Sequence, residues 1–183
     1  MVLGEAWDRL HPAVQQLHLQ HGEAELIGHG ALDVRHGTNP FCRLMAWALR
    51  LPRAGRNVRT RLRVVRTESG EAWERHFRGV PFFTMQEPGE DSTFTEIIGP
   101  IALRMKLVVE DGCLLYQPVH ASFKMGRLSI PIPRWCYSSS YAREMACPGS
   151  DEPSMIVSMS IPFLGLLVQY FGSMQITSKG EGS

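Results

Sequence analysis

The chain has 183 residues, of which 44% are hydrophobic and 20% are charged, as in an ordinary folded domain. Nineteen Lys and Arg residues face eighteen Asp and Glu residues, so the net charge is only +1. This balance argues against a nucleic-acid-binding protein and against a polybasic domain that binds membrane surfaces.

The compartment and the domain organisation follow from features that the sequence lacks. The N-terminus has no charged start followed by an apolar run, and Pro162 and Gly165 interrupt the longest apolar stretch, so we expect no membrane span. The four cysteines are scattered and form no C-x-x-C pair. We therefore expect a cytoplasmic protein with one domain over residues 1–177 and a disordered polar tail over 178–183.

The first helical segment lies near the N-terminus. Apolar residues recur at steps of three and four from Trp7 to Leu17, which is typical of one face of a helix. Pro12 lies inside this run and predicts a break near His11. An extended segment follows around residues 24–34.

A second helix is predicted over residues 40–51. Thr38 or Asn39 can cap it and Pro40 suits its first position. Its expected apolar stripe is formed by Phe41, Leu44, Met45, Ala48 and Leu51. This helix could cover the mouth of a barrel as a lid, or simply pack against the rest of the domain.

After Gly55 the sequence becomes a series of extended runs separated by Gly, Pro and acidic turns. Strands are predicted near 57–67, 71–78, 81–87, 92–98, 101–110, 113–123, 128–137, 140–147, 154–162 and 167–177. Short strands with tight turns indicate a mainly β fold, namely an antiparallel lipocalin-like barrel or half-barrel with two short N-terminal helices. The alternative is a helix-grip fold, which needs a long C-terminal helix where this sequence has a strand-like segment.

Alternation along the strands places charged side chains in the interior. Most strands have one apolar and one polar face, but on two of them charged residues share the face of aromatic ones. These are Glu71 and Arg75 with Trp73 and Phe77, and Glu96 with Phe94. A lone buried charge costs several kcal/mol, so we expect Arg75 and Glu96 to form a polar cluster, with Glu71 as a further candidate member.

This cluster has two interpretations. It is either a structural ion pair or the polar anchor of a cavity that binds an apolar ligand. For the second interpretation the expected ligand contacts are Glu71, Trp73, Phe77, Phe94, Met105, Tyr116, His120, Met159 and Tyr170. His120 is included because simple alternation places it on the same side of its strand as Tyr116.

Other kinds of site have little support. There is no P-loop and no G-x-G-x-x-G fingerprint, and Gly28-His29-Gly30 lacks the rest of the dinucleotide motif, so no cofactor is expected. His18 and His21 are three residues apart, but no carboxylate completes a metal site with them. We therefore expect no metal.

Two motifs stand out in the strand region: G-E-A-W-E-R-H-F-R-G from Gly70 and F-T-E-I-I-G-P from Phe94. Together with R-L-H-P-A-V, L-P-R-A-G and G-L-L-V-Q-Y-F-G at the expected places along the chain, they resemble a family known as domain of unknown function 4166. Trp73, Arg75, Glu96 and Gly99 are motif positions. Members often follow a saccharopine-dehydrogenase-like or epimerase-like domain, so the resemblance implies a domain that works beside a separate reductase, but it implies no reaction.

Three functions remain open at this stage. The first is binding of a hydrophobic small molecule, lipid-like or polyketide-like, with Arg75 and Glu96 orienting its polar group. The second is a cofactor-independent isomerase or cyclase in which Glu96 transfers the proton and Arg75 sets its pKa. The third is a docking domain for a reductase-like partner, in which the charged pair serves only the fold.

Overall fold

The computed structural model of the chain describes residues 3–19, 23–137, 139–147, 149 and 151–181. Strand is the dominant secondary structure there. The strands are β1 (Glu23–Arg35), β2 (Gly55–Arg66), β3 (Glu71–Phe77), β4 (Val80–Pro88), β5 (Thr93–Ile98), β6 (Ile101–Glu110), β7 (Cys113–Met125), β8 (Leu128–Pro131), β9 (Tyr141–Ala146), β10 (Pro153–Ile161) and β11 (Gly165–Glu181). The helices are η1 (Gly4–Arg9), α1 (Pro12–Gln16), α2 (Pro40–Ala48) and η2 (Arg134–Cys136).

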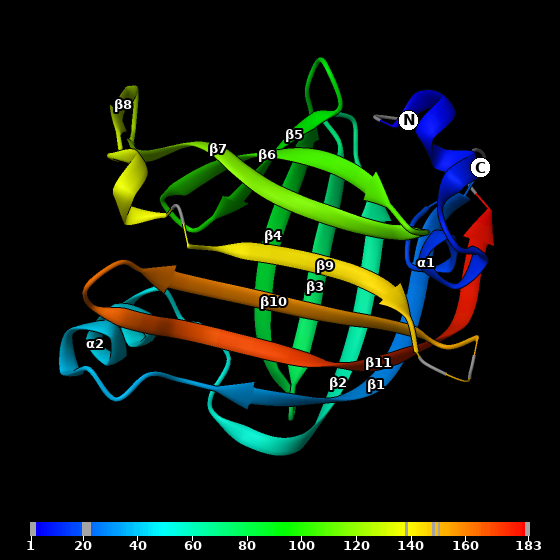
Figure 1. The fold of residues 1–183 in the computed structure, drawn as a ribbon, viewed down its shortest axis with the longest axis horizontal. Helices are drawn as coiled ribbons and strands as arrows, with labels where there is room; N and C mark the ends of the chain where they lie inside the picture. The colour runs from blue at the N-terminus through cyan, green and yellow to red at the C-terminus, as the bar shows by residue number, and fades with distance from the viewer. Residues whose placement is uncertain (1–2, 20–22, 138, 148, 150, 182–183) are drawn as a thin grey trace.

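The strands form a closed antiparallel barrel of ten strands (Figure 1). Each of β1 to β6 pairs with the next strand, β6 pairs with β7, and the ring returns through β9, β10 and β11 to β1. β8 pairs with β7 and stands outside the ring as the second arm of a hairpin. Closure leaves the described strands of the ring without a long unpaired edge, and the predicted barrel is confirmed.

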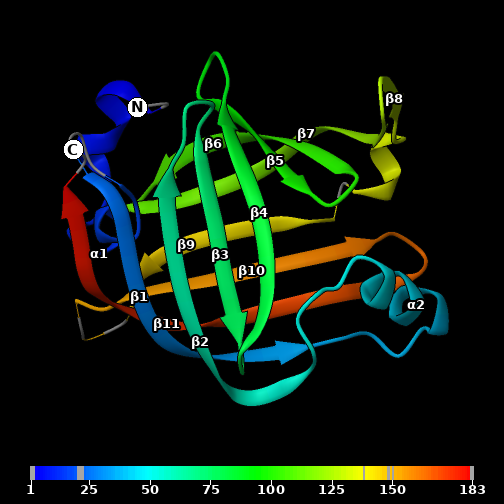
Figure 2. The same cartoon turned by 180° about the vertical axis from the view of Figure 1, so that it is seen from behind.

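Two long strands carry the sheet around the barrel. β1 and β11 pair along most of their length, and both curve from one wall of the barrel into the other (Figures 1 and 2). Glycines stand where the two strands leave no room for a side chain: a Cβ on Gly30 would lie 2.2 Å from the carbonyl oxygen of Ser173, and one on Gly172 would lie 2.5 Å from that of Ala31. Gly28-His29-Gly30 therefore belongs to this bend, in the interior of a strand.

The sequence predicted the two N-terminal helical regions in place, but most of the predicted apolar face of α2 was wrong. Phe41, Leu44 and Ala48 are exposed, whereas Met45 packs on the core and Leu51, beyond the end of the helix, is buried. Asn39 caps α2 by accepting a hydrogen bond from the Phe41 amide, and Pro40 occupies the first turn, as expected. The helix ends at Ala48, and the buried side chains are those of Cys42 and Ala46. Small residues face the barrel because α2 lies close to the β10–β11 turn, where Cys42 Sγ is 3.5 Å from the Leu164 carbonyl oxygen.

Two chain segments differ from the predicted boundaries. The strand predicted over 128–137 stops at Pro131, and a 3-10 turn follows, because prolines at 131 and 133 cannot continue a ladder. β11 runs to Glu181 and pairs with β1, so residues 178–181 belong to the barrel and not to a disordered tail. Residues 182–183 lie outside the described part of the chain.

The helices lie at opposite ends of the barrel (Figures 1 and 2). η1 and α1 cover the end at which Leu10 and Val14 pack on Phe94, Leu114 and Tyr116 of the barrel strands. α2 lies at the other end, together with the β10–β11 turn. In the described residues, no helix is both long and apolar enough to cross a membrane.

Candidate ligand-binding site

Arg75 lies inside the barrel. β3 alternates strictly, so Trp73, Arg75 and Phe77 all face the core, and Arg75 is only 8% exposed. Its Nη1 donates to Thr84 Oγ1 on the neighbouring strand at 3.0 Å, and its Cζ lies 4.9 Å from the centre of the Trp73 ring. Its Nε is buried without a hydrogen-bond partner among the described residues. The guanidinium is therefore only partly satisfied.

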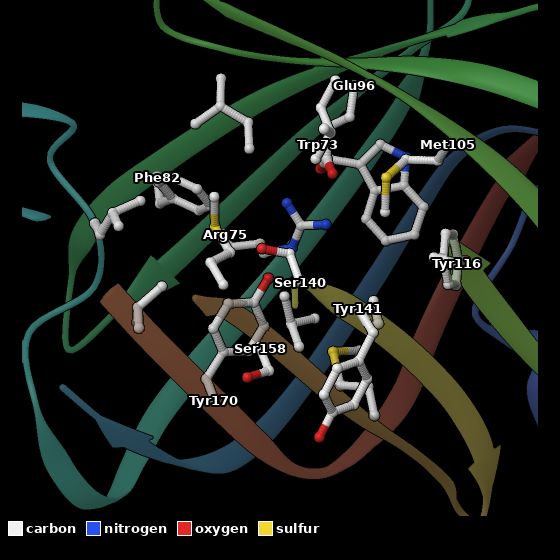
Figure 3. A pocket seen from close by; sticks show the side chains of 18 of the residues that line it. Trp73, Arg75, Phe82, Glu96, Met105, Tyr116, Ser140, Tyr141, Ser158 and Tyr170 are labelled. Atoms are coloured by element: carbon white, nitrogen blue, oxygen red, sulfur yellow. The ribbon is translucent and has the colours of Figure 1, made fainter. Parts of the chain in front are cut away.

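Glu96 enters the same space from β5 (Figure 3). Its carboxylate extends toward the Arg75 guanidinium, but no ion pair within 4.0 Å joins the two among the described residues. The predicted cluster is therefore present as two charged groups that share one interior. The negative charge of Glu96 helps to raise the pKa of Tyr170 and of Tyr116, whereas the positive charge of Arg75 opposes both increases.

Two buried phenols complete this polar interior. Burial is the main reason why the pKa of Tyr170 is raised, and burial followed by the charge of Glu144 raises the pKa of Tyr116 well above its ordinary value. Both hydroxyls therefore keep their protons at neutral pH. The Tyr170 hydroxyl points toward the guanidinium of Arg75 (Figure 3), so a hydrogen-bond donor and a cation face the same space.

The space around these groups is small. A cavity of about 60 Å³ reaches Arg75 and Glu96. Its walls are mostly apolar and include Trp73, Phe82, Met105, Tyr116, Met159 and Tyr170. Since one water needs about 10–15 Å³ of such space, the cavity holds a few waters or a compact head group of a ligand.

A larger cavity of about 400 Å³ lies toward the end that η1 covers. Its walls include Trp7, His18, Leu19, Glu71, Phe94, Leu107 and Leu114. Gln86 and Tyr116 line both cavities, so their side chains lie at the boundary between the two. A space of this size is typical of sites for small molecules.

A histidine–glutamate pair lies beside this boundary. His18 Nε2 is 2.7 Å from Oε2 of Glu144, and both side chains are largely buried. Burial lowers the pKa of His18, but the charge of Glu144, the hydrogen bond to it and the charge of Glu71 outweigh burial, so the pKa is raised. A protonated His18 donates to Glu144. His18 lines the larger cavity and Glu144 the smaller one.

Aromatic rings hold His18 in place. The rings of Trp7 and Trp73 lie 6.1 and 5.9 Å from the His18 ring, between centres. Trp73 also donates from Nε1 to Glu71 Oε2 at 3.1 Å. Trp73 therefore contacts the cation of Arg75, the imidazole and a carboxylate, and links the two cavities.

Most predicted contact residues come together, but two do not. Trp73, Met105, Tyr116, Met159 and Tyr170 line the smaller cavity, and Glu71 and Phe94 line the larger one. Phe77 is buried against the ring of Tyr170 at 5.5 Å between centres, and it lines neither of these cavities.

The placement of His120 in the interior was wrong. A β-bulge shifts the β6–β7 register between Met105, which pairs with Pro118, and Arg104, which pairs with His120. Val119 is the extra residue, so the alternation changes phase after it. Ala121 faces inward and His120 is exposed.

Sequence reasoning missed His18 and Glu144. His18 was considered only as a metal ligand, and in the described residues no group of three or more His, Cys, Asp or Glu side chains is arranged to hold a metal ion. His21 lies outside those residues. Glu144 shares its strand face with Ala142, and that inward alternation was the one signal that could have revealed a buried carboxylate.

Fold and site together define a class of protein: a closed antiparallel β-barrel with two charged groups and two phenols in an apolar interior. The comparison with protein families identifies the family. The family model described as "Domain of unknown function (DUF4166)" matches residues 10–174, so the chain belongs to this family. A search of curated proteins finds no significant match.

Proposed function

We propose that the barrel binds an apolar small molecule that carries a compact polar group. The unpartnered Nε of buried Arg75 is the observation on which this proposal depends, because a buried donor of a charged group needs an acceptor. A bound ligand would supply that acceptor. Lipid-like and polyketide-like molecules have the required chemistry.

The two cavities suggest where the polar and the apolar parts of such a ligand bind. The smaller one suits the head group, which accepts a hydrogen bond from Arg75 and donates one to Glu96, as a hydroxyl or a protonated carboxyl group does. The larger one suits an apolar chain. Gln86 or Tyr116 at the boundary must move to admit a ligand that occupies both.

Displacement of an apolar fluorescent dye by undecane, undecanol and undecanoic acid tests this proposal. Since a hydrogen bond to a charged group contributes about 1.5–3 kcal/mol, the alcohol and the acid should bind at least about tenfold more tightly than the hydrocarbon. Arg75→Met should remove this preference, and Leu107→Trp should weaken all three ligands by filling the larger cavity. Arg61→Met, on the exposed face of β2, is the control. Equal affinity of the three ligands, or no saturable binding, would contradict the proposal.

Acid–base catalysis without a cofactor is the second candidate. It is favoured by the meeting of the Glu96 carboxylate, the Arg75 cation and the two protonated phenols in one apolar space. Glu96 would then move a proton next to a carbonyl group of the ligand. Deuterium exchange into bound undecan-2-one, followed by NMR, tests this reaction. Glu96→Gln should stop exchange and leave dye displacement by undecan-2-one unchanged, because this ketone has no hydrogen-bond donor for Glu96; exchange that persists in the variant excludes Glu96 as the catalyst.

A further inference from the structure

The two ends of the barrel carry opposite charge, which the net charge of +1 conceals. We define the α2 end as residues 36–56, 78–79, 99–100, 124–137, 139–140 and 162–164. These are the connections on the side of α2, together with β8 and the adjoining ends of β2 and β7. Its cations are Arg43, Arg50, Arg53, Arg56, Arg78, Lys124, Arg127 and Arg134. These segments contain no Asp or Glu.

The opposite end has the reverse character. The segments 3–19, 67–70, 89–92, 111–112, 147 and 151–152 connect strands or precede them there. Their acidic residues are Glu5, Asp8, Glu68, Glu90, Asp91, Asp111, Asp151 and Glu152. Arg9 is the only Lys or Arg in these segments. The charge separation gives the molecule a dipole along the barrel, which orients it in front of a charged surface.

The cations of the α2 end are available for a partner. All of them are exposed, and none has a carboxylate within 4.0 Å among the described residues. By contrast, Arg63 on the outer wall of β2 pairs with Glu25 at 2.6 Å. An unneutralised cluster of this kind matches an anionic surface.

Large apolar side chains stand among these cations. On α2 and the adjacent β10–β11 turn, Trp47 is 77% exposed and Phe163 is 98% exposed, with Leu44 at 59% and Phe41 at 52%. The β7–β8–η2 segment projects at the same end (Figures 1 and 2). It adds exposed Met125, Leu128, Ile130 and Trp135. A concentration of exposed apolar side chains marks an interaction surface.

Phe163 is held outward by its backbone. Its φ angle is 68°, a conformation that a bulky residue rarely adopts and that glycine adopts freely. The turn is fixed to α2, since Cys42 Sγ lies 3.5 and 3.8 Å from the carbonyl oxygens of Leu164 and Gly165. Trp47 and Phe163 therefore stand on two elements, α2 and the β10–β11 turn, that are in direct contact.

We propose that the α2 end docks on the surface of a lipid bilayer that contains anionic lipids. Trp47 and Phe163 enter the headgroup region, where aromatic side chains are favoured, and the arginines lie against lipid phosphates. The acidic end then faces away from the membrane. Cations mixed with aromatic side chains on several projecting elements suit a fluid anionic interface better than one fixed protein partner.

Docking does not depend on ligand binding. Arg75 lies in the barrel interior, whereas the docking residues are exposed at one end. Arg75→Met should therefore bind vesicles as the unchanged protein does. Failure of the ligand proposal and failure of the docking proposal can thus be told apart.

Sedimentation with vesicles tests the docking. The full chain should bind vesicles of phosphatidylcholine and phosphatidylserine, and binding should fall as salt is raised, because salt screens exposed charges. Pure phosphatidylcholine vesicles should bind it much more weakly. Attraction to anionic lipids contributes about 1 kcal/mol per basic residue, which corresponds to roughly fivefold in affinity. Arg43→Gln with Arg53→Gln removes two such residues and should therefore weaken binding by roughly 30-fold.

Matched variants separate the docking end from the rest of the surface. Trp47→Ser with Phe163→Ser should weaken binding to anionic vesicles at least about tenfold. The controls remove the same kinds of side chain elsewhere: Arg9→Gln with Lys106→Gln, and Phe83→Ser with Val119→Ser, which are all exposed positions. These controls should bind as the unchanged protein does, and circular dichroism should show that every variant is folded.

Three results would overturn the proposal. The first is no preference for anionic over neutral vesicles. The second is equal loss of binding in the control variants and in the docking variants. The third is self-association of the protein in ultracentrifugation, abolished by Trp47→Ser with Phe163→Ser, together with no binding to vesicles. That result would show that the α2 end binds the acidic end of a second copy.

Discussion

Arg75 and His18 show how differently two cations can be accommodated in one barrel. The guanidinium of Arg75 donates to the Thr84 hydroxyl and lies over the Trp73 ring, but its Nε has no partner among the described residues. His18, by contrast, lies 2.7 Å from the carboxylate of Glu144. Because the histidine is paired, its contribution to stability can be measured through its proton.

The raised pKa of His18 predicts a pH dependence of folding. The native protein holds the proton of His18 more tightly than the unfolded chain, whose histidine pKa is about 6.5. The contribution to the free energy of unfolding is therefore complete below about pH 6.5 and is lost as pH rises through the native pKa. Urea unfolding between pH 5 and 9 should show this fall, and His18→Asn should flatten it.

His120→Asn provides the matched control for this experiment. His120 is exposed, so its removal should leave the pH dependence of the unfolding free energy unchanged. A variant His18→Asn that keeps the full dependence of the unchanged protein would show that the His18–Glu144 pair is not its source.

The orientation of a side chain could be predicted from the sequence where the pattern of a single strand was sufficient. Alternation in β3 and β5 was enough to place Arg75 and Glu96 in the interior, because neither strand contains a bulge in its pairing. It could not reveal the partner of His18, because Glu144 is 126 residues away and only the closed sheet brings the two together.

At the level of elements, glycine determines how closely β1 and β11 approach. We predict that Gly30→Ala destabilises the protein by about 1–3 kcal/mol, because the new Cβ would lie 2.2 Å from the backbone oxygen of Ser173 and 2.6 Å from Met174 Sδ. Gly180→Ala, in the same strand pair, meets its nearest atom at an ordinary 3.6 Å and should be nearly neutral. Thermal and urea unfolding would compare the two; equal effects would contradict this account.

Helix α2 shows what amphipathic pattern alone cannot decide. Its cap and first turn were predictable from Asn39 and Pro40, because these act within a few residues. Its buried face was not, since the largest side chains, such as Trp47, face solvent and small Cys42 faces the barrel. A sequence pattern assumes that apolar residues face the core, and that assumption fails where an element uses them for another surface.

At the level of the whole molecule, the barrel is closed unevenly. Among the described residues, twelve pairs join β1 to β11, but only Leu114–Tyr116 of β7 pair with Ala142–Glu144 of β9. The β7–β9 seam should therefore open before the rest of the barrel.

Hydrogen–deuterium exchange followed by mass spectrometry checks this prediction. Peptides that cover β9 should exchange through local opening, well before peptides from the centres of β1 and β2. Equally slow exchange in all of these strands would show that the seam opens only with global unfolding.

The strand count and order were largely predictable because tight turns join neighbours in sequence. Ring closure through β6, β7 and β9 was predicted only as one of two outcomes, barrel or half-barrel. It depends on contacts between distant strands that no local pattern encodes.

The extra residue at Val119 has a consequence for how the barrel would respond to a deletion. Deleting Val119 would join Pro118 directly to His120 in an uninterrupted ladder, which would keep the imidazole of His120 in solvent and Ala121 in the lumen. One lost codon would thus remove the irregularity of the strand and leave the lining of the barrel as it is.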